Sequence, residues 1–242
     1  MQLFYNASID TNTKAFTFDK SESKHIIKVL RKSEGDQLSI TNGKGDFFDI
    51  IILTANPKKC IGKVINIKSV NQLPYNLHLA VAPTKLNDRY EWFLEKATEI
   101  GITEITPIIC DHSERKIINL DRFEKKIQSA MKQSLKSYLP KLNKATTFKN
   151  FLISQENNTQ QKLIAHCEET SKKTLKSVLK KRRDTTILIG PEGGFTNSEI
   201  IIANKLGFQS INLGKRVAPP QPGTRPRKTS GKPVNAVDES VL

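Results

Sequence analysis

The feature that most limits the possible fold is a regular alternation of short apolar segments with amphipathic ones between residues 76 and 213. The apolar segments are rich in Leu, Ile and Val, which is typical of buried strands. We expect strands at 77–82, 105–110, 163–167, 185–189 and 210–213. Strands that alternate with helices form a mostly parallel sheet with helices on both faces. The sequence therefore predicts an α/β fold here.

Three amphipathic helices are expected between these strands, over residues 88–100, 121–139 and 172–183. The first is closed by Gly101, and its expected inner face consists of Phe93, Ala97 and Ile100. The second is expected to carry an apolar stripe of Phe123, Ile127, Met131, Leu135 and Tyr138. The third is very basic, which fits a solvent-exposed face slightly better than an RNA-binding one.

A glycine-rich turn, residues 190–194, separates the strand at 185–189 from a further helix. Thr196 stands three residues before Glu199, which is the pattern of a capping box, and Gly207 ends this helix. Its expected inner face consists of Ile200, Ala203 and Leu206. Free N–H groups at such turns bind ligands in open α/β sheets. A tight turn without a ligand is the competing interpretation, and the turn matches neither a Walker A loop nor a dinucleotide fingerprint.

The N-terminal part, residues 1–72, consists mainly of segments expected to be β-strands. Two of them are residues 46–53 and 60–67, and Asn42-Gly43 is a hairpin signal before the first. A helical insert at 23–31 buries Ile26, Ile27 and Leu30 and presents Lys24, Lys28 and Arg31 on its other side. A small barrel that presents these cations fits an RNA-binding module, and a solvated helix face explains them equally well.

The net charge of +15 and the pI of about 9.7 favour a polyanionic partner, most simply nucleic acid. A lysine-rich solvated surface is the alternative. We expect no membrane span and no signal peptide, and hence a cytoplasmic protein. Three cysteines in no CxxC pair and four scattered histidines predict neither disulfides nor a metal site.

The composition changes abruptly after Val217. Up to this residue the chain is rich in Ile, Lys and Asn, whereas residues 218–227 read APPQPGTRPR, with no apolar periodicity. We predict that residues 218–242 form a disordered tail. The change suggests a frameshift, a fusion or a vector-derived end.

Five segments in order make residues 2 to about 217 resemble the RsmE-type 16S rRNA uridine-N3 methyltransferases of the SPOUT, or α/β-knot, class. They are HIIKVLR (25–31), EKATEIG (95–101) running into ITP (105–107), AMKQS (130–134), IGPEGGF (189–195) and LGKRV (213–217). Each alone is weak, but their order and spacing are specific. The resemblance implies a PUA-like β-barrel at 1–72, a SPOUT α/β-knot methyltransferase domain at 73–217 and a divergent tail at 218–242.

The resemblance also implies S-adenosylmethionine (SAM) as methyl donor, 16S rRNA as partner and a homodimer. It implies a cofactor held by main-chain groups of three loops. The residues it points to are Leu163, Ala165, Gly190, Glu192, Gly193, Gly194, Leu213, Gly214 and Val217. The role expected of Gly193 and Gly194 is to let the main chain approach the adenosyl group.

For the chemistry, Arg216 is the candidate catalytic residue, because its charge would stabilise negative charge on the uracil oxygens. Pairing with a phosphate or a carboxylate is the alternative. Glu192 is a candidate base, or a charge that favours the following helix. The cations expected to hold RNA phosphates are Lys24, Lys28, Arg31, Arg89 and Arg115.

One departure from the family bears on activity. Family members continue after LGxRV with an LRTETA-like segment and an apolar helix, whereas here the prolines Pro219 and Pro220 disfavour a helix. We therefore expect weakened SAM binding and an incomplete knot. A non-catalytic RNA-binding protein is the alternative to methylation of uridine N3. A small-molecule enzyme of the nucleotide-binding α/β class explains the glycine turn but not the charge or the barrel.

Overall fold

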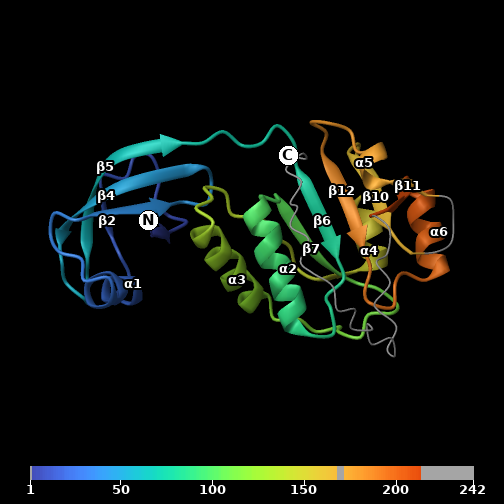
Figure 1. The fold of residues 1–242 in the computed structure, drawn as a ribbon, viewed down its shortest axis with the longest axis horizontal. Helices are drawn as coiled ribbons and strands as arrows, with labels where there is room; N and C mark the ends of the chain where they lie inside the picture. The colour runs from blue at the N-terminus through green and yellow to red at the C-terminus, as the bar shows by residue number, and fades with distance from the viewer. Residues whose placement is uncertain (1, 168–171, 214–242) are drawn as a thin grey trace, which may run out of the picture.

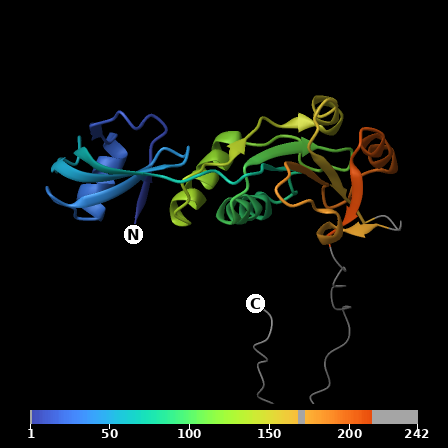
Figure 2. The same ribbon diagram turned by 90° about the horizontal axis from the view of Figure 1, so that it is seen from above.

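The protein folds into two bodies that follow one another along the chain (Figure 1). The structure is a computed structural model that describes residues 2–167 and 172–213. The first body contains a five-stranded sheet and the second an eight-stranded sheet. An extended segment joins β5 (Ile61–Ser69) of the first to β6 (Leu77–Val81) of the second, and Figure 2 shows the same arrangement from above. The expectations for residues 214–242 lie outside the described residues.

The first body is the expected β-structure. Its strands are β1 (Leu3–Tyr5), β2 (Ala15–Thr17), β3 (Gln37–Thr41), β4 (Asp46–Thr54) and β5, in the order β1-β3-β4-β5-β2. Irregular pairing between β4 and β5 accompanies the curl of the sheet. Completely buried side chains such as Ile40 and Phe48 fill the concave side. Gly43, with φ +71°, lies in the connection between β3 and β4, as the hairpin signal predicted.

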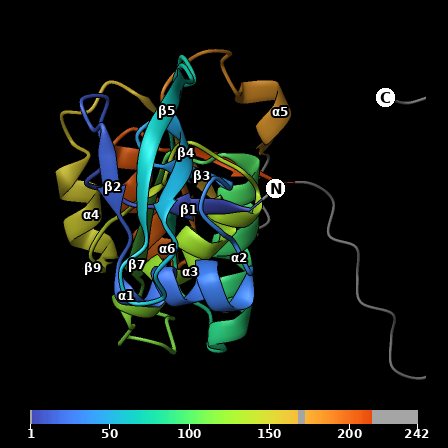
Figure 3. The ribbon, with the colours of Figure 1, turned by 90° about the vertical axis from the view of Figure 1, so that its left-hand side faces the viewer.

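The basic helical insert of this body is also present. Asp19 caps α1 (Lys20–Lys24), which continues into a π-helical turn, η1 (His25–Val29). Ile26 is completely buried, whereas Lys24 and Lys28 are exposed on the opposite side. The predicted division between an apolar and a cationic side is therefore confirmed, and Figure 3 shows α1 below the strands of the sheet.

The second body contains the predicted parallel sheet. Its strand order is β11-β13-β10-β12-β6-β7-β8, with every neighbouring pair parallel, and β9 pairs with β7. The remaining bounds are β7 (Glu104–Ile109), β8 (Lys141–Leu142), β9 (Thr146–Thr147), β10 (Gln161–Ala165), β11 (Lys173–Thr174), β12 (Thr185–Ile189) and β13 (Gln209–Asn212).

Helices cover both faces of this sheet, because successive strand residues point to opposite sides. On one face, Ile164 and Leu188 pack against α4 (Phe148–Ser154) and α6 (Asn197–Lys205). On the other face, Val81 packs against α2 (Asn87–Ile100) and α3 (Leu120–Gln133). The same face also carries α5 (Leu175–Val178). The predicted α/β class is confirmed.

Two helix predictions were partly wrong. Helix α3 ends at Gln133 rather than 139, because Leu135 adopts φ +53° and the N–H of Lys136 bonds the carbonyl of Met131. Leu135 is exposed, so it does not extend the apolar stripe. In α2, Ile100 is 82% exposed, since the buried stripe contains Tyr90, Leu94 and Ala97 instead.

The prediction of a long basic helix at 172–183 was wrong. The described residues form only the two-residue strand β11 and the single turn α5. Thr174 caps this turn, and Leu179 already has extended backbone angles. Only Leu175 and Val178 reach the apolar core, so the lysines around them had no apolar stripe on which to build a longer helix.

Candidate cofactor site and basic surface

The carboxyl ends of four parallel strands meet at one edge of the sheet. Ala165 of β10 pairs with Ile189 of β12 and with Ile211 of β13, while Ile189 also pairs with Val81 of β6. The loops after these strands therefore begin at the same level. Figure 1 shows β6 and β12 pointing in the same direction. This is the edge at which parallel α/β sheets bind ligands.

The glycine turn lies at this edge, and two of its three glycines are packed closely against side chains of the protein. The N–H of Gly194 bonds the carbonyl of Pro191 at 2.9 Å, which closes a tight turn. A Cβ on Gly190 would lie 3.1 Å from the ring of Phe195, and one on Gly193 would lie 3.1 Å from the Cβ of His112. The position that a Cβ on Gly193 would take thus faces His112. The expected main-chain role of Gly193 beside the cofactor stays a prediction.

Gly194 differs from the other two. Its φ of +73° is in the left-handed region, and no atom of the described residues lies within 4 Å of the position that a Cβ would take. The turn is therefore open beside Gly194. The N–H groups of Glu192 and Gly193 have no hydrogen-bond partner within the described ranges. An edge with free main-chain donors beside an open glycine fits a ligand such as SAM that is held by main-chain groups.

The predicted capping box is present at the start of α6. The Thr196 side chain accepts from the N–H of Glu199, and the Glu199 carboxylate accepts from the N–H of Thr196 at 2.8 Å. The same carboxylate accepts from the N–H of Asp111 at 3.0 Å, in the loop after β7. Through these two contacts the buried Glu199 carboxylate joins the start of α6 to the loop after β7. The cap itself consists of Thr196 and Glu199, and the expected influence of the Glu192 charge on this helix stays a prediction.

The loop after β7 also holds the glycine turn itself. The Nδ1 of His112 lies 3.1 Å from the carbonyl oxygen of Gly193 and 3.3 Å from that of Gly194. Carbonyl oxygens only accept, so Nδ1 carries the proton in this contact. Sequence reasoning missed His112, although its place directly after a strand of the sheet was a usable signal.

Arg115 and Glu192 join a third loop, the one between β6 and α2. The Nε of Arg115 donates to the carbonyls of Thr84 and Lys85, each at 3.2 Å, and its Nη2 donates to Lys85 at 2.5 Å. The Glu192 carboxylate accepts from the N–H of Lys85 at 3.1 Å. Three loops from distant parts of the sequence thus form one connected edge, which we call the loop clamp. Its side-chain members are Glu192, His112 and Arg115.

The remaining residues predicted to bind the cofactor differ in their distance from the carboxyl edge of the sheet. Ala165 and Leu213 lie at the carboxyl edge, at the end of β10 and directly after β13. Leu163 lies inside β10, paired with both neighbouring strands and completely buried, so it offers no free group to a ligand at that edge. Gly214, Arg216 and Val217 lie outside the described residues.

The predicted RNA-binding cations fall into two groups. Lys24, Lys28 and Arg31 are exposed on the barrel, and Arg89 is exposed in the first turn of α2. Figures 1 and 3 show α1 on the same lower side of the molecule as the start of α2. Arg115 is instead engaged in the loop clamp, where two of its nitrogens bond main-chain carbonyls.

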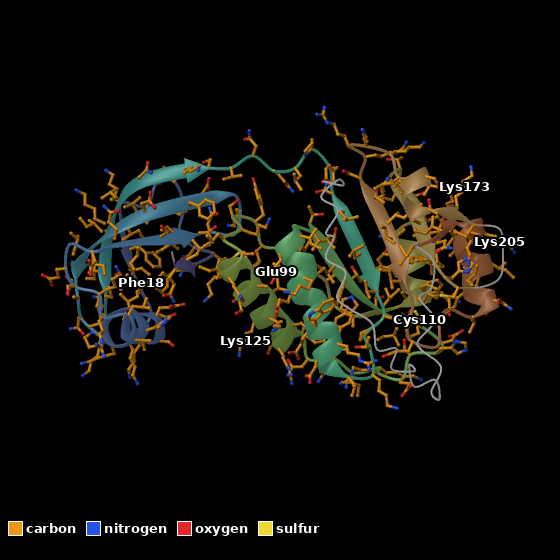
Figure 4. All side chains as sticks on the ribbon, in the orientation of Figure 1. Phe18, Glu99, Cys110, Lys125, Lys173 and Lys205 are labelled. Carbon is orange, nitrogen blue, oxygen red and sulfur yellow. The ribbon has the colours of Figure 1, made fainter. Side chains whose placement is uncertain are left out.

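Other reactive groups are accounted for. Burial raises the pKa of the Cys110 thiol, and the nearby Glu199 and Asp111 carboxylates add to this rise, so the thiol stays protonated. Cys110 is labelled in Figure 4. Within the described ranges, no three His, Cys, Asp or Glu side chains are grouped closely enough to bind a metal ion. No helix among the same residues has the length and apolar character needed to cross a membrane.

Comparison with known proteins agrees with this geometry. Residues 71–218 match the family model of the RNA methyltransferase domain, and residues 18–65 match that of the RNA methyltransferase PUA domain. The ribosomal RNA small subunit methyltransferase E of Mesomycoplasma hyopneumoniae is 35% identical over 216 residues, which cover 84% of this chain and 91% of that protein.

Solved structures are similar over most of the chain. A probable rRNA methyltransferase from Porphyromonas gingivalis has a TM-score of 0.81 and 36% identity, covering 89% of this chain and 90% of that one. A putative methyltransferase from Legionella pneumophila, solved with bound SAM, has a TM-score of 0.77 and 27% identity, covering 89% and 90%. The chain therefore belongs to the ribosomal RNA small subunit methyltransferase E family, with a PUA-type N-terminal domain and a SPOUT-type α/β methyltransferase domain.

Proposed function

We propose that this protein transfers the methyl group of SAM to N3 of a uridine in 16S rRNA. The observation that carries the proposal is the connected carboxyl edge of the sheet. There the N–H groups of Glu192 and Gly193, which have no partner among the described residues, lie beside an open turn at Gly194. The SAM-bound Legionella pneumophila relative supports the choice of cofactor. The reaction takes place in the cytoplasm on the small ribosomal subunit, and the protein acts as a homodimer.

The cofactor supplies an electrophilic methyl group, and the protein supplies position and electrostatics. The main-chain groups of residues 190–194 and those following Ala165 and Leu213 hold the adenosyl part. The loop clamp keeps the turn from shifting, because His112 and Glu192 tie it to two other loops. Fixed positioning of this kind accelerates transfer when the reacting atoms lie in line.

The uracil must lose its N3 proton, which is not acidic at neutral pH. Arg216 is proposed to stabilise the resulting negative charge on the uracil oxygens. The exposed cations Lys24, Lys28, Arg31 and Arg89 bind phosphates of the RNA and position it. The carboxylate of Glu192 is a weak candidate for the base, since it accepts the N–H of Lys85.

The test is methyl transfer from labelled SAM to small-subunit RNA, with the modified base located by mass spectrometry. We expect label at N3 of a single uridine. Label on another base or on ribose would contradict the proposed specificity. Lys24→Ala combined with Lys28→Ala is expected to weaken RNA binding and its salt dependence, while Lys205→Ala, on α6, serves as the matched control.

We further propose that the sequence after Val217 weakens SAM binding, because Pro219 and Pro220 replace the family's LRTETA-like segment. Isothermal titration is expected to give binding much weaker than micromolar, and ordinary micromolar binding would contradict this. The second candidate function is RNA binding without methyl transfer, and the same change of sequence after Val217 favours it. It predicts retention of the protein on RNA with no incorporation of label.

A further inference from the structure

A cavity of about 350 Å³ lies between the barrel and α3 of the methyltransferase domain. Its apolar side includes Ile127 and Leu142, and its polar side includes Tyr5, Lys44, Glu124 and Gln128. The polar residues come from β1, from the connection between β3 and β4, and from α3. The cavity is separate from the loop clamp, and the function proposed above does not use it. Its volume falls in the range of cavities that bind small organic groups.

The walls of this cavity are fixed by hydrogen bonds between the two bodies. The N–H of Leu139 donates to the carbonyl of Gly43 at 2.9 Å, and the N–H of Gly45 donates to that of Ser137 at 2.9 Å. The hydroxyl of Tyr138 donates to the carbonyl of Val70 at 2.7 Å. The barrel and the segment after α3 are therefore held together, and the cavity is a built feature rather than a gap between loose domains.

Glycine at position 43 is needed to bring Tyr5 into the wall. Gly43 has φ +71°, and a Cβ there would lie 2.9 Å from Cε2 of Tyr5 and 3.1 Å from the Cβ of Leu139. Any other residue would push the aromatic ring or the Leu139 segment away. Close approach at this point places an aromatic side chain beside the polar residues of α3.

Three of the polar side chains of this cavity carry hydrogen-bonding groups that are available to a ligand. Within the part of the chain that the structure describes, the side chains of Tyr5, Glu124 and Gln128 make no hydrogen bond. Glu124 and Gln128 are one helical turn apart, so they line the same side of α3. Burial, and then the Glu124 carboxylate, raise the pKa of Tyr5, so its hydroxyl remains a donor at neutral pH. The cavity therefore presents both hydrogen-bond donors, on Tyr5 and Gln128, and acceptors, on Glu124 and Gln128, to a ligand.

We propose that this cavity binds one unpaired nucleobase of the RNA substrate, in addition to the uridine that is methylated. The amide of Gln128 and the carboxylate of Glu124 hydrogen-bond the edge of the base, Tyr5 provides an aromatic wall, and Lys44 binds the adjoining phosphate. The proposal rests on the RNA substrate proposed above.

The chemistry of the lining favours this ligand. A base presents both donors and acceptors on its edge, and proteins that read RNA sequence take up unpaired bases beside aromatic side chains. An anion alone would be repelled by the Glu124 carboxylate, and a purely apolar group would make no use of the hydrogen-bonding groups of Gln128 and Glu124.

A first experiment tests the cavity without any methyl transfer. Nitrogen-labelled protein is titrated with the four ribonucleoside monophosphates, and the side-chain amide of Gln128 is assigned from the signal lost in Gln128→Ala. We expect saturable shifts of this amide, with one base preferred. No shift with any of the four at millimolar concentration overturns the proposal, as does a shift caused only by an unrelated peptide and not by nucleotides.

A second experiment measures binding of a small-subunit RNA fragment by fluorescence anisotropy. Gln128→Ala and Glu124→Gln are each expected to weaken binding by about tenfold, with SAM titration unchanged. Gln209→Ala, an exposed amide on β13, is the matched control and is expected to bind RNA normally. Unchanged affinity in both cavity variants overturns the proposal even when the wild-type protein methylates RNA. Loss of methyl transfer with the Gln128 shifts intact would instead argue against the proposed function alone.

Discussion

The barrel and the parallel sheet bury the same kinds of apolar side chain but present different groups for function. In the parallel sheet, Ala165 and Ile189 end neighbouring strands at one edge, so loops distant in sequence meet there. In the barrel, most neighbouring strands are antiparallel, so consecutive loops lie at opposite ends. The cations predicted to bind RNA lie instead on its helical insert, at Lys24 and Lys28.

This difference is the physical reason for proposing that one body supplies the chemistry and the other the surface for RNA. Main-chain groups converge where strands are parallel, and a ligand held by main-chain groups needs that convergence. A surface that binds phosphates needs only cations of suitable spacing, which an exposed helix provides. The cavity lined by Tyr5 and Gln128 lies where the two bodies meet.

The largest expected effect tests whether the two bodies are stable independently of each other. Leu188→Ala removes a completely buried side chain from the centre of the parallel sheet, and we expect it to lower the free energy of unfolding by about 3 kcal/mol. Hydrogen exchange is expected to lose protection in residues 77–212 and to keep it in the barrel. Ile40→Ala in the barrel is the matched change, with the reverse pattern. Equal loss in both bodies would show that they unfold as one unit.

The next effect concerns the link between two loops of the carboxyl edge. Glu199→Ala removes the acceptor for the N–H groups of Thr196 and Asp111. We expect the free energy of unfolding, measured by thermal unfolding, to fall by about 2 kcal/mol. Glu192→Ala removes a single contact of an exposed side chain and is expected to have a much smaller effect. Similar destabilisation by both substitutions would show that burial of Glu199 does not matter.

A smaller effect is expected on the reaction itself. Arg115→Lys keeps the charge but loses the two-nitrogen contact with the Thr84 and Lys85 carbonyls, and we expect methyl transfer to slow by about tenfold with little change in stability. The measurement is the rate of label incorporation into RNA. Lys85→Ala is the control, because its exposed side chain pairs with Glu114 at the surface and Arg115 contacts only its main-chain carbonyl. A normal rate in Arg115→Lys would mean that Arg115 does not position the turn.

The smallest expected effect is a pH dependence of stability caused by His78, at the start of β6 and so at the end of the sheet opposite the carboxyl edge. Burial lowers the pKa of His78 below its ordinary value of 6.5; Glu104 opposes this and Lys141 adds to it. Between the two pKa values the unfolded chain binds a proton at His78 that the folded protein does not. The contribution of neutral, buried His78 to the free energy of unfolding is therefore fully present above pH 6.5 and is lost as the pH falls through the lower pKa of the folded protein. The slope is at most about 1.4 kcal/mol per pH unit. Urea unfolding of His78→Gln between pH 7.5 and 5.5 is expected to show a smaller dependence than wild type, and an identical dependence would contradict this.

Much of the fold could be predicted because local signals and tertiary packing agree. The strand at 185–189 and the capping box of Thr196 and Glu199 appear as the pattern indicated. The predictions failed where local periodicity had no tertiary partner. The basic segment at 172–183 has too few apolar residues to hold a long helix against the sheet, and Leu135 leaves α3 where the chain turns toward the barrel.

The sequence by itself determined the alternation of the main strands and helices, the place of the glycine turn and the family, because these depend on neighbouring residues and on motif order. Only the tertiary structure decided what the turn contacts. His112 and Arg115 lie far from residues 190–194 in sequence, and they reach that turn and its neighbouring loop because parallel strands end at a common edge. The cavity at Tyr5 and Gln128 has the same origin, since no local pattern records which side chains two folded bodies bring together.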